Sequence, residues 1–260
     1  SLIIFAGIVA ELPRAIYNLV AQARTTSVDI GFVLGILVMV IGLIVFIVFI
    51  ERSQRRLLVQ YPKRQQGNRV YGGETSFMPL KINTAGVIPP IFASSLLLLP
   101  ATAMGFLATA ELPAWAQWVP GMVGQLQHGQ SLFMVFYAGL IIFFSFFYTS
   151  IVFNPDDTAE NLRKYGGFLP GIRPGKRTAE YLDYVLTRLT VIGAVYITLV
   201  CLMPEALIGF YNAPFYLCGT SILIVVTVTM DTVAQIQSHL LSHQYEGLIK
   251  KSKLRGGRSK

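Results

Sequence analysis

Long runs of uncharged, mostly apolar residues recur along this chain, and they limit its fold more than any other feature does. Residues 31–50 form one run of twenty, and similar runs occupy residues 82–110, 131–153, 184–203 and 214–230, with Arg188 as the one charged residue among them. A helix of about 20 apolar residues crosses the roughly 30 Å of hydrocarbon in a bilayer. The sequence therefore predicts an all-α integral membrane protein with about five complete transmembrane helices.

The composition excludes several other classes of protein. Charged residues make up only 13% of the 260 residues and hydrophobic residues 53%, whereas about a quarter of a typical globular chain is charged. A disordered chain, a disulfide-rich secreted scaffold and a nucleic-acid domain with a wholly polar surface are all excluded. The two cysteines, Cys201 and Cys218, lie in apolar runs and do not have metal-site spacing.

The first apolar segment is too short to span a membrane. Residues 2–10 are apolar, and Glu11 ends the run after nine residues. Nine helical residues extend about 14 Å, roughly half of a bilayer. The chain begins with Ser1, and no basic segment typical of a signal peptide precedes the run. We therefore expect the chain to begin inside a transmembrane helix and to be the C-terminal part of a longer protein.

The basic residues are distributed unevenly between the connecting segments. Together with Arg188, residues 51–83, 154–183 and 237–260 hold 19 of the 21 lysines and arginines. The alternate connections hold only Arg14 and Arg24, and residues 108–130 hold none. Because successive spans alternate in direction, all the basic segments lie on one side, which the positive-inside rule makes the cytoplasm.

The spans contain no arrangement typical of catalysis or of ion coupling. Glu11, Arg188, Glu205 and Asp231 all lie near the ends of apolar runs, whereas ion-coupled transporters usually carry ionisable residues near mid-membrane. His239 and His243 share a helix face, but no third ligand is nearby, so a solvated helix face is favoured over a metal site. We expect no metal, no cofactor and no enzymatic activity, with a transporter half and an intramembrane enzyme as the rival interpretations.

One cytoplasmic segment has an unusual composition. Residues 166–175 contain four glycines and two prolines around Arg173. Such a segment predicts a stiff, non-helical projection with Arg173 near its tip. It is either a solvated loop or a docking site for an acidic or polyanionic partner.

Several motifs together resemble the SecY family, the central subunits of bacterial protein-translocation channels. These motifs are Glu51-Arg52-x-Gln54-Arg55-Arg56, Tyr61-x-Lys63-Arg64-Gln65-Gln66-Gly67, Asn83-x-Ala85-Gly86-Val87-Ile88-Pro89, Phe153-Asn154-Pro155, Pro170-Gly171-Ile172-Arg173-Pro174-Gly175 and Pro214-Phe215-Tyr216. The match runs from Ser1 to the basic tail. The chain is identified as a member of this family and as its second half.

The resemblance implies a division of the chain along the family's ten-helix channel. Transmembrane helices five to ten correspond to residues 1–22, 31–50, 84–107, 131–153, 184–208 and 214–236. Residues 51–83 and 154–183 become basic cytoplasmic loops, 108–130 an external loop and 237–260 a basic cytoplasmic tail.

The resemblance also implies roles for individual residues. Ile88 and Ile224 match positions in the apolar ring that seals the pore. One side of the lateral gate, through which signal sequences reach lipid, is formed by residues 84–107 and 131–153. Its residues include Asn83, Pro89, Phe92, Ser94 and Ser95. Docking of the ribosome or of the SecA motor is assigned to basic residues, namely Arg55, Arg56, Lys63, Arg64, Arg69, Lys164, Arg173, Lys176 and Arg177.

The function implied by the resemblance is passage of unfolded polypeptides across the bacterial plasma membrane, with lateral release of transmembrane segments. The expected partners are SecE, SecG, SecA, the ribosome, signal peptides and nascent chains, membrane lipids and the missing N-terminal half. An apolar pore fits this task independently, because fixed charges would bind some passing sequences too tightly to release them.

Overall fold

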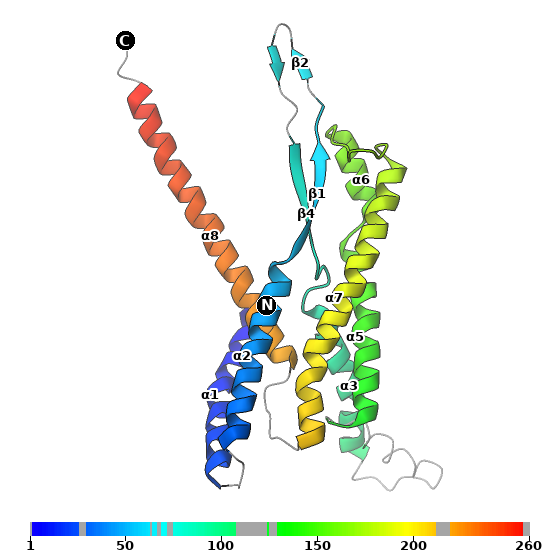
Figure 1. Ribbon diagram of the computed structural model, residues 1–260, viewed down its shortest axis with the longest axis vertical. Coiled ribbons are helices and arrows are strands. Elements are labelled where there is room, and N and C mark those ends of the chain that lie inside the picture. Colours follow the sequence, from blue (N-terminus) through cyan, green and yellow to red (C-terminus); the bar gives the residue numbers. More distant parts are fainter. Residues whose placement is uncertain are drawn as a thin grey trace.

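Most of the chain is helical in the computed structural model, which describes residues 2–25, 30–62, 64–66, 69–71, 75–107, 124, 129–211 and 219–256. Figure 1 shows long helices below and two β-ribbons projecting above them. In chain order the elements are α1 (Leu2–Thr25), α2 (Ile30–Arg52), β1 (Gln54–Gln60), β2 (Arg64–Gln66), β3 (Arg69–Tyr71), β4 (Thr75–Lys81), α3 (Ile88–Leu107), α5 (Ser131–Val152), α6 (Pro155–Lys164), α7 (Lys176–Tyr211) and α8 (Gly219–Gly256).

Among the described residues, four helical segments are long and apolar enough to cross a membrane. They are Leu34–Arg52, Ser131–Lys164, Lys176–Gly209 and Gly219–Leu241. The remaining span expected from the sequence falls on α3, a helix of 20 residues whose segment Ile88–Pro100 is apolar. The predicted helical membrane fold is confirmed. Most of the expected external loop, residues 108–130, lies outside the described residues.

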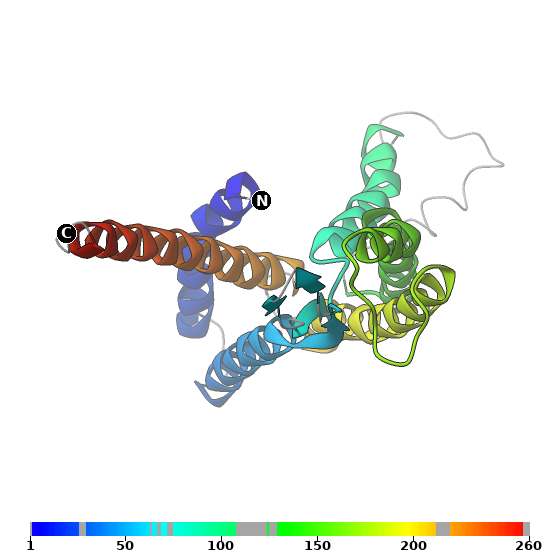
Figure 2. The same ribbon diagram turned by 90° about the horizontal axis from the view of Figure 1, so that it is seen from above.

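The helices form two groups that share one apolar core. In Figures 1 and 2, α1, α2 and α8 lie on one side, and α3, α5 and α7 lie on the other. The core draws buried residues from both groups, including Ile47 of α2, Ala93 of α3, Ile141 of α5, Ile197 of α7 and Leu223 of α8. The α7 and α8 backbones meet so closely that a Cβ atom on Gly219 would lie 2.6 Å from the Val200 carbonyl oxygen. Only glycine fits this contact.

Two helices extend well beyond their apolar segments. Helix α7 begins at Lys176, inside the expected cytoplasmic loop, and α8 continues to Gly256, through most of the expected tail. Figure 1 shows α8 projecting away from the other helices. No proline follows Pro214 in the sequence, so nothing interrupts the backbone hydrogen bonds of α8.

The first basic loop is a β-hairpin, which the sequence analysis did not predict. Strands β1 and β4 pair antiparallel, from Gln54 opposite Lys81 to Gln60 opposite Thr75. Strands β2 and β3 form a second, shorter antiparallel pair further along the same projection. In β1, Leu57 and Val59 are buried, which is the alternation expected for a strand with one covered face.

A second apolar cluster joins this hairpin to the other basic loop. We call it the cytoplasmic platform, after the side of the membrane that the sequence predicts for both loops. Its buried members are Leu57, Leu80, Ala159, Leu169, Ala179, Leu182, Val185 and Leu189. The backbone amides and carbonyls of Gln60 and Phe168 also exchange two hydrogen bonds of 2.9 Å. A Cβ atom on Gly167 would lie 3.1 Å from side-chain atoms of Val59 and Tyr61. The two loops are therefore one folded unit.

The platform depends on Leu182, which is fully buried within it. Leu182→Ala removes side-chain volume that neighbouring groups refill only in part, and such changes cost about 2–5 kcal/mol. We expect faster amide hydrogen exchange in β1, β4 and residues 165–175. Leu199→Ala, an exposed position on the same helix, is the matched control and should leave this exchange unchanged. Equal exchange in the two variants would contradict the platform's role.

Candidate functional site

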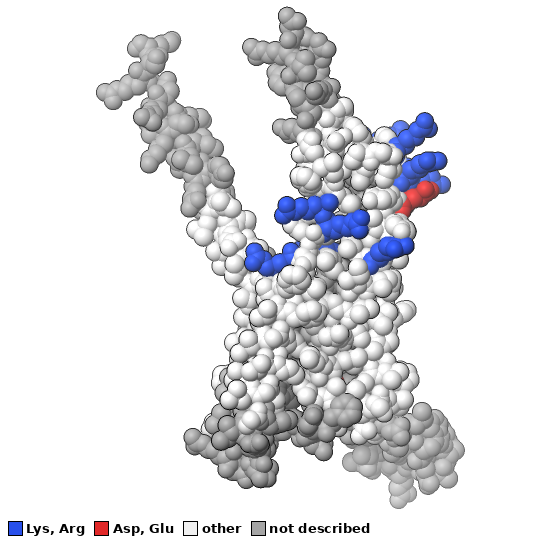
Figure 3. Space-filling model, in the orientation of Figure 1, with Lys and Arg blue, Asp and Glu red and all other residues white. Residues whose placement is uncertain are grey.

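The described lysine and arginine side chains of the two basic loops gather at one end of the molecule, whereas Arg14 lies on α1. Figure 3 shows them over the hairpin, α6 and the start of α7, with none on the lower half of the described surface in this view. Arg55, Arg56, Lys164, Arg173, Lys176 and Arg177 are all exposed there. Lys164 forms an i,i+4 ion pair of 3.2 Å with Glu160. Exposed pairs of this kind contribute little to stability, so the lysine remains available to a partner.

Arg173 lies on a loop whose neighbouring residues are anchored. Ile172 packs against the cytoplasmic platform, and its amide donates to the Leu169 carbonyl at 3.1 Å. The Thr178 hydroxyl donates to the Arg173 carbonyl at 3.0 Å. Gly171 and Gly175 have φ angles of 84° and 114°, which favour glycine. The prediction that this segment is non-helical is confirmed, and the exposed guanidinium is held by an ordered backbone.

The remaining predicted docking residues lie on the β2–β3 ribbon. Arg64 pairs with Tyr71 and Arg69 with Gln66 in the backbone register of this ribbon. Lys63 lies outside the described residues. Figure 1 places the ribbon beyond β1 and β4, at the far end of the projection. The structure therefore places Arg64 and Arg69 beyond the platform that carries Arg55 and Arg173.

The predicted gate residues belong to the start of α3 and the turn before it. Asn83 is 4% exposed, and its Nδ2 donates to Glu51 Oε1 at 2.6 Å. Its Oδ1 accepts from the Gly86 amide at 3.0 Å. Gly86 has a φ of 66°, and α3 begins two residues later at Ile88. Sequence reasoning found Asn83 but missed its partner Glu51.

The first turns of α3 carry polar groups that bond back onto the helix. The hydroxyls of Ser94 and Ser95 donate to the Ile91 carbonyl at 3.0 and 2.8 Å. Pro89 is fully buried, and a proline in the first helical turn removes no helical hydrogen bond.

Phe92 is 55% exposed and stacks on Phe144 of α5, with 5.7 Å between ring centroids. Helices α3 and α5 therefore form one continuous wall.

The two predicted ring residues take no part in the described apolar clusters. Ile224 is 5% exposed and Ile88 is half-buried. Their neighbours Val87, Leu223 and Val226 pack into the helix core, whereas Ile88 and Ile224 do not. Ile224 is therefore covered by other parts of this chain, whereas Ile88 stays partly accessible.

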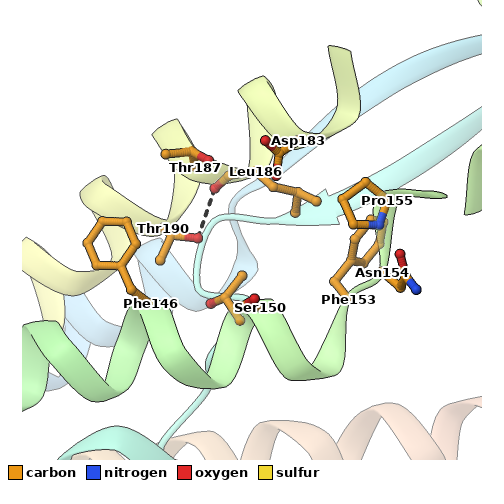
Figure 4. A pocket seen from close by; sticks show the side chains of 10 residues that line it. Phe146, Ser150, Phe153, Asn154, Pro155, Asp183, Leu186, Thr187 and Thr190 are labelled. Atoms are coloured by element: carbon orange, nitrogen blue, oxygen red, sulfur yellow. Dashed lines mark hydrogen bonds between the residues drawn. The ribbon is translucent and has the colours of Figure 1, made fainter. Parts of the chain in front are cut away.

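A pocket of about 420 Å³ lies where α5 and α6 meet α7. Figure 4 shows Ser150, Asn154 and Asp183 among the side chains around it, with the Thr190 hydroxyl bonded to the Leu186 carbonyl. Sequence analysis did not identify this pocket, because its lining comes from two distant segments. Among the described residues, no group of three or more His, Cys, Asp or Glu side chains could hold a metal ion.

These features define a polytopic helical membrane protein with a folded basic platform at one end. Its spans contain an apolar core, and the start of one helix, α3, is tied to the neighbouring α2 by a buried polar contact.

The chain belongs to the SecY family, whose model matches residues 1–233, and the resemblance inferred from the motifs is thereby confirmed. The protein translocase subunit SecY of Pseudomonas aeruginosa is 52% identical over 256 residues, which cover 98% of this chain and 57% of that protein. The subunit of the same name from Escherichia coli strain K12 is 51% identical, with the same coverage. The chain thus spans somewhat more than half the length of these relatives.

Solved structures show the same fold at much lower sequence identity. One concerns the plug domain of the SecY protein and its part in the closed state, with a TM-score of 0.58, 15% identity, and coverage of 89% of this chain and 57% of the other. Another is described as a protein conducting channel, with a TM-score of 0.55, 15% identity, and coverage of 84% and 52%.

Proposed function

We propose that this chain is the second half of the pore-forming subunit of a protein-conducting channel. In this proposal, α1, α2, α3, α5, α7 and α8 correspond to the family's transmembrane helices five to ten. The channel passes unfolded secretory polypeptides across the bacterial plasma membrane and releases transmembrane segments sideways into lipid. The chain has no enzymatic activity in this proposal, and energy comes from a partner.

The observation that carries the proposal is the lack of charge inside the described helix bundle. The buried polar or charged residues are Asn83, Ser145, Thr149, Thr178, Thr190 and Glu205, and Glu205 is the one ionisable group among them. It lies beside Pro204, toward the end of α7. An apolar passage excludes ions by dewetting without binding the polypeptide tightly. A coupled transporter instead usually carries ionisable residues near mid-membrane.

The cytoplasmic platform supports a docking role for the basic residues. Exposed arginines and lysines on two loops are held by shared packing and by the hydrogen bonds between Gln60 and Phe168. A preorganised basic surface suits a polyanionic or acidic partner, because little conformational entropy is lost on binding. We propose the ribosome and the SecA motor as its partners, with the platform and the α8 extension in the cytoplasm.

The wall formed by α3 and α5 supports a lateral gate. Phe92 and several α5 phenylalanines, including Phe136, Phe143 and Phe147, are exposed. Such a face suits contact with lipid or with an apolar signal sequence. In this proposal the missing N-terminal half supplies the opposite side of the gate, and SecE and SecG complete the complex.

Reconstitution tests this function directly. The full-length protein, purified with its partner subunits into vesicles, should move a signal-bearing polypeptide into a protease-protected lumen when the motor and ATP are supplied. Vesicles lacking the protein are the control. Saturable uptake of a small solute without polypeptide translocation would instead support the transporter interpretation.

A further inference from the structure

Polar side chains from four segments meet where α2 ends, and we call this group the α2-end cluster. It consists of Glu51 from α2, Lys81 from β4, Asn83 from the turn before α3, and Asp231 from α8. Asn83 Nδ2 donates to Glu51 Oε1 at 2.6 Å, and Lys81 Nζ lies 3.8 Å from Asp231 Oδ1. Both Lys81 and Asp231 interact electrostatically with the Glu51 carboxylate.

The Glu51–Asn83 contact is the strongest member of this cluster. It is short, it joins a carboxylate to a nearly fully buried amide, and charge-assisted hydrogen bonds are stronger than neutral ones. The Lys81–Asp231 pair is long, and its side chains are 63% and 59% exposed. Exposed pairs of this kind contribute little. Glu51 is therefore the member of the cluster that contributes most to holding the Asn83–Gly86 turn in place.

The contact with Asn83 fixes the backbone at the start of α3. Asn83 holds both sides of the turn, because its Oδ1 accepts from the Gly86 amide and its Nδ2 donates to the Gly86 carbonyl. Helix α7 packs closely against the residue before this turn, since a Cβ atom on Gly193 would lie 2.9 Å from the Ile82 carbonyl oxygen. A movement of α3 relative to α2 must therefore break the Glu51–Asn83 hydrogen bond or carry α2 with it.

We propose that Glu51 is a positioning residue that holds the start of α3 in its resting place through Asn83. This inference rests on the proposed function in one respect: it assumes that α3 moves when the channel opens. Opening separates the carboxylate from the amide. The strength of this one hydrogen bond then contributes to the balance between resting and open states, independently of the apolar ring.

Four variants of the full-length protein separate this role from a general need for polar residues. Asn83→Asp places a second carboxylate against Glu51 and should displace the turn. Glu51→Ala removes the acceptor without adding repulsion, and it keeps the test valid if Asn83→Asp does not fold. Glu51→Gln retains a carbonyl acceptor and should stay close to the parent. The double variant Glu51→Gln with Asn83→Asp reverses donor and acceptor and should restore the contact.

The readout is the distance between spin labels on the exposed positions Val45 of α2 and Leu99 of α3, measured by pulsed electron resonance in a background free of other reactive cysteines. Asn83→Asp and Glu51→Ala should raise the displaced population about tenfold, the size expected for loss of one charged hydrogen bond. Asn161→Asp on α6, an exposed position, makes the same chemical change outside the cluster and should have no effect.

The outcomes separate this proposal from the proposed function. Parent-like distances in both Asn83→Asp and Glu51→Ala would overturn it, and so would failure of the double variant to restore the parent distance. If the distances respond and are rescued while resting conductance and polypeptide translocation stay at parent levels, Glu51 is upheld as a positioning residue. In that case it is the role of α3 as the gate that fails.

Discussion

Arg173→Glu is expected to weaken binding of the SecA motor and of the ribosome by about tenfold or more at physiological salt, while the protein still inserts into the membrane. The guanidinium is exposed at the basic end, and the surrounding backbone is anchored by Ile172 and Thr178. Reversing a charge in an electrostatically complementary interface replaces attraction by repulsion, and most of that effect appears in the association rate and the salt dependence. Equilibrium binding to vesicles that contain the full-length complex, measured over a salt series, checks this result.

Arg163→Glu is the matched control for Arg173. It makes the same change in net charge at an exposed position on α6, outside the predicted docking set. A loss confined to Arg173→Glu would identify a specific contact. Equal losses in the two variants would reduce the effect to overall charge, and unchanged binding in both would count against docking at this loop.

Ile224→Asn, and separately Ile88→Asn, is expected to make the resting channel conduct ions, with conductance at least about tenfold above the parent. Both positions are proposed members of the apolar ring; Ile224 is buried within this chain and Ile88 is half-buried. An amide at a constriction keeps water in place, and a hydrated constriction no longer blocks ions. Single-channel recording of the full-length complex without substrate measures this leak.

Ile224→Leu is the control, since it keeps the side chain apolar and nearly isosteric. It should leave the resting channel closed. If Ile224→Asn and Ile88→Asn also leave conductance at the parent level, these positions do not line a passage and the ring assignment is wrong.

Hydropathy predicted the membrane-spanning helices well, because burial in lipid leaves an uninterrupted local signal. The run at residues 31–50 became α2, and the run at residues 131–153 became α5. Helix α3 contains Pro100, just as α1 contains Pro13 and α7 contains Pro204, and none of these prolines ends its helix. The α8 extension was predicted only at His239 and His243, and its full length to Gly256 was missed because its polar residues resemble a tail.

The cytoplasmic platform could not be predicted from the local sequence. Its hairpin contributes only Leu57 and Leu80 to the buried cluster, and arginines at nearby positions masked the strand pattern. The partners of these leucines are about a hundred residues further along the chain. Only tertiary packing brings Leu57 and Leu182 into one cluster.

The candidate site was predicted in part. Motifs pointed to Asn83 and Arg173, but not to the hydrogen bond between Asn83 and Glu51, because a side chain's partner depends on how the helices are placed. The roles of Ile88 and Ile224 are still predictions from the motifs. The structure gives only their burial, which is nearly complete for Ile224 and partial for Ile88.

Site-specific photocross-linking to an arrested translocation intermediate tests the central claim most directly. A photoreactive residue is placed at Ile88 or Ile224 of the full-length protein, and at Val45 and Leu199 as exposed positions outside the proposed passage. The account predicts adducts with the translocating polypeptide at Ile88 and Ile224 and with lipid at Val45 and Leu199. Lipid adducts at all four positions, with none to the polypeptide, would contradict it.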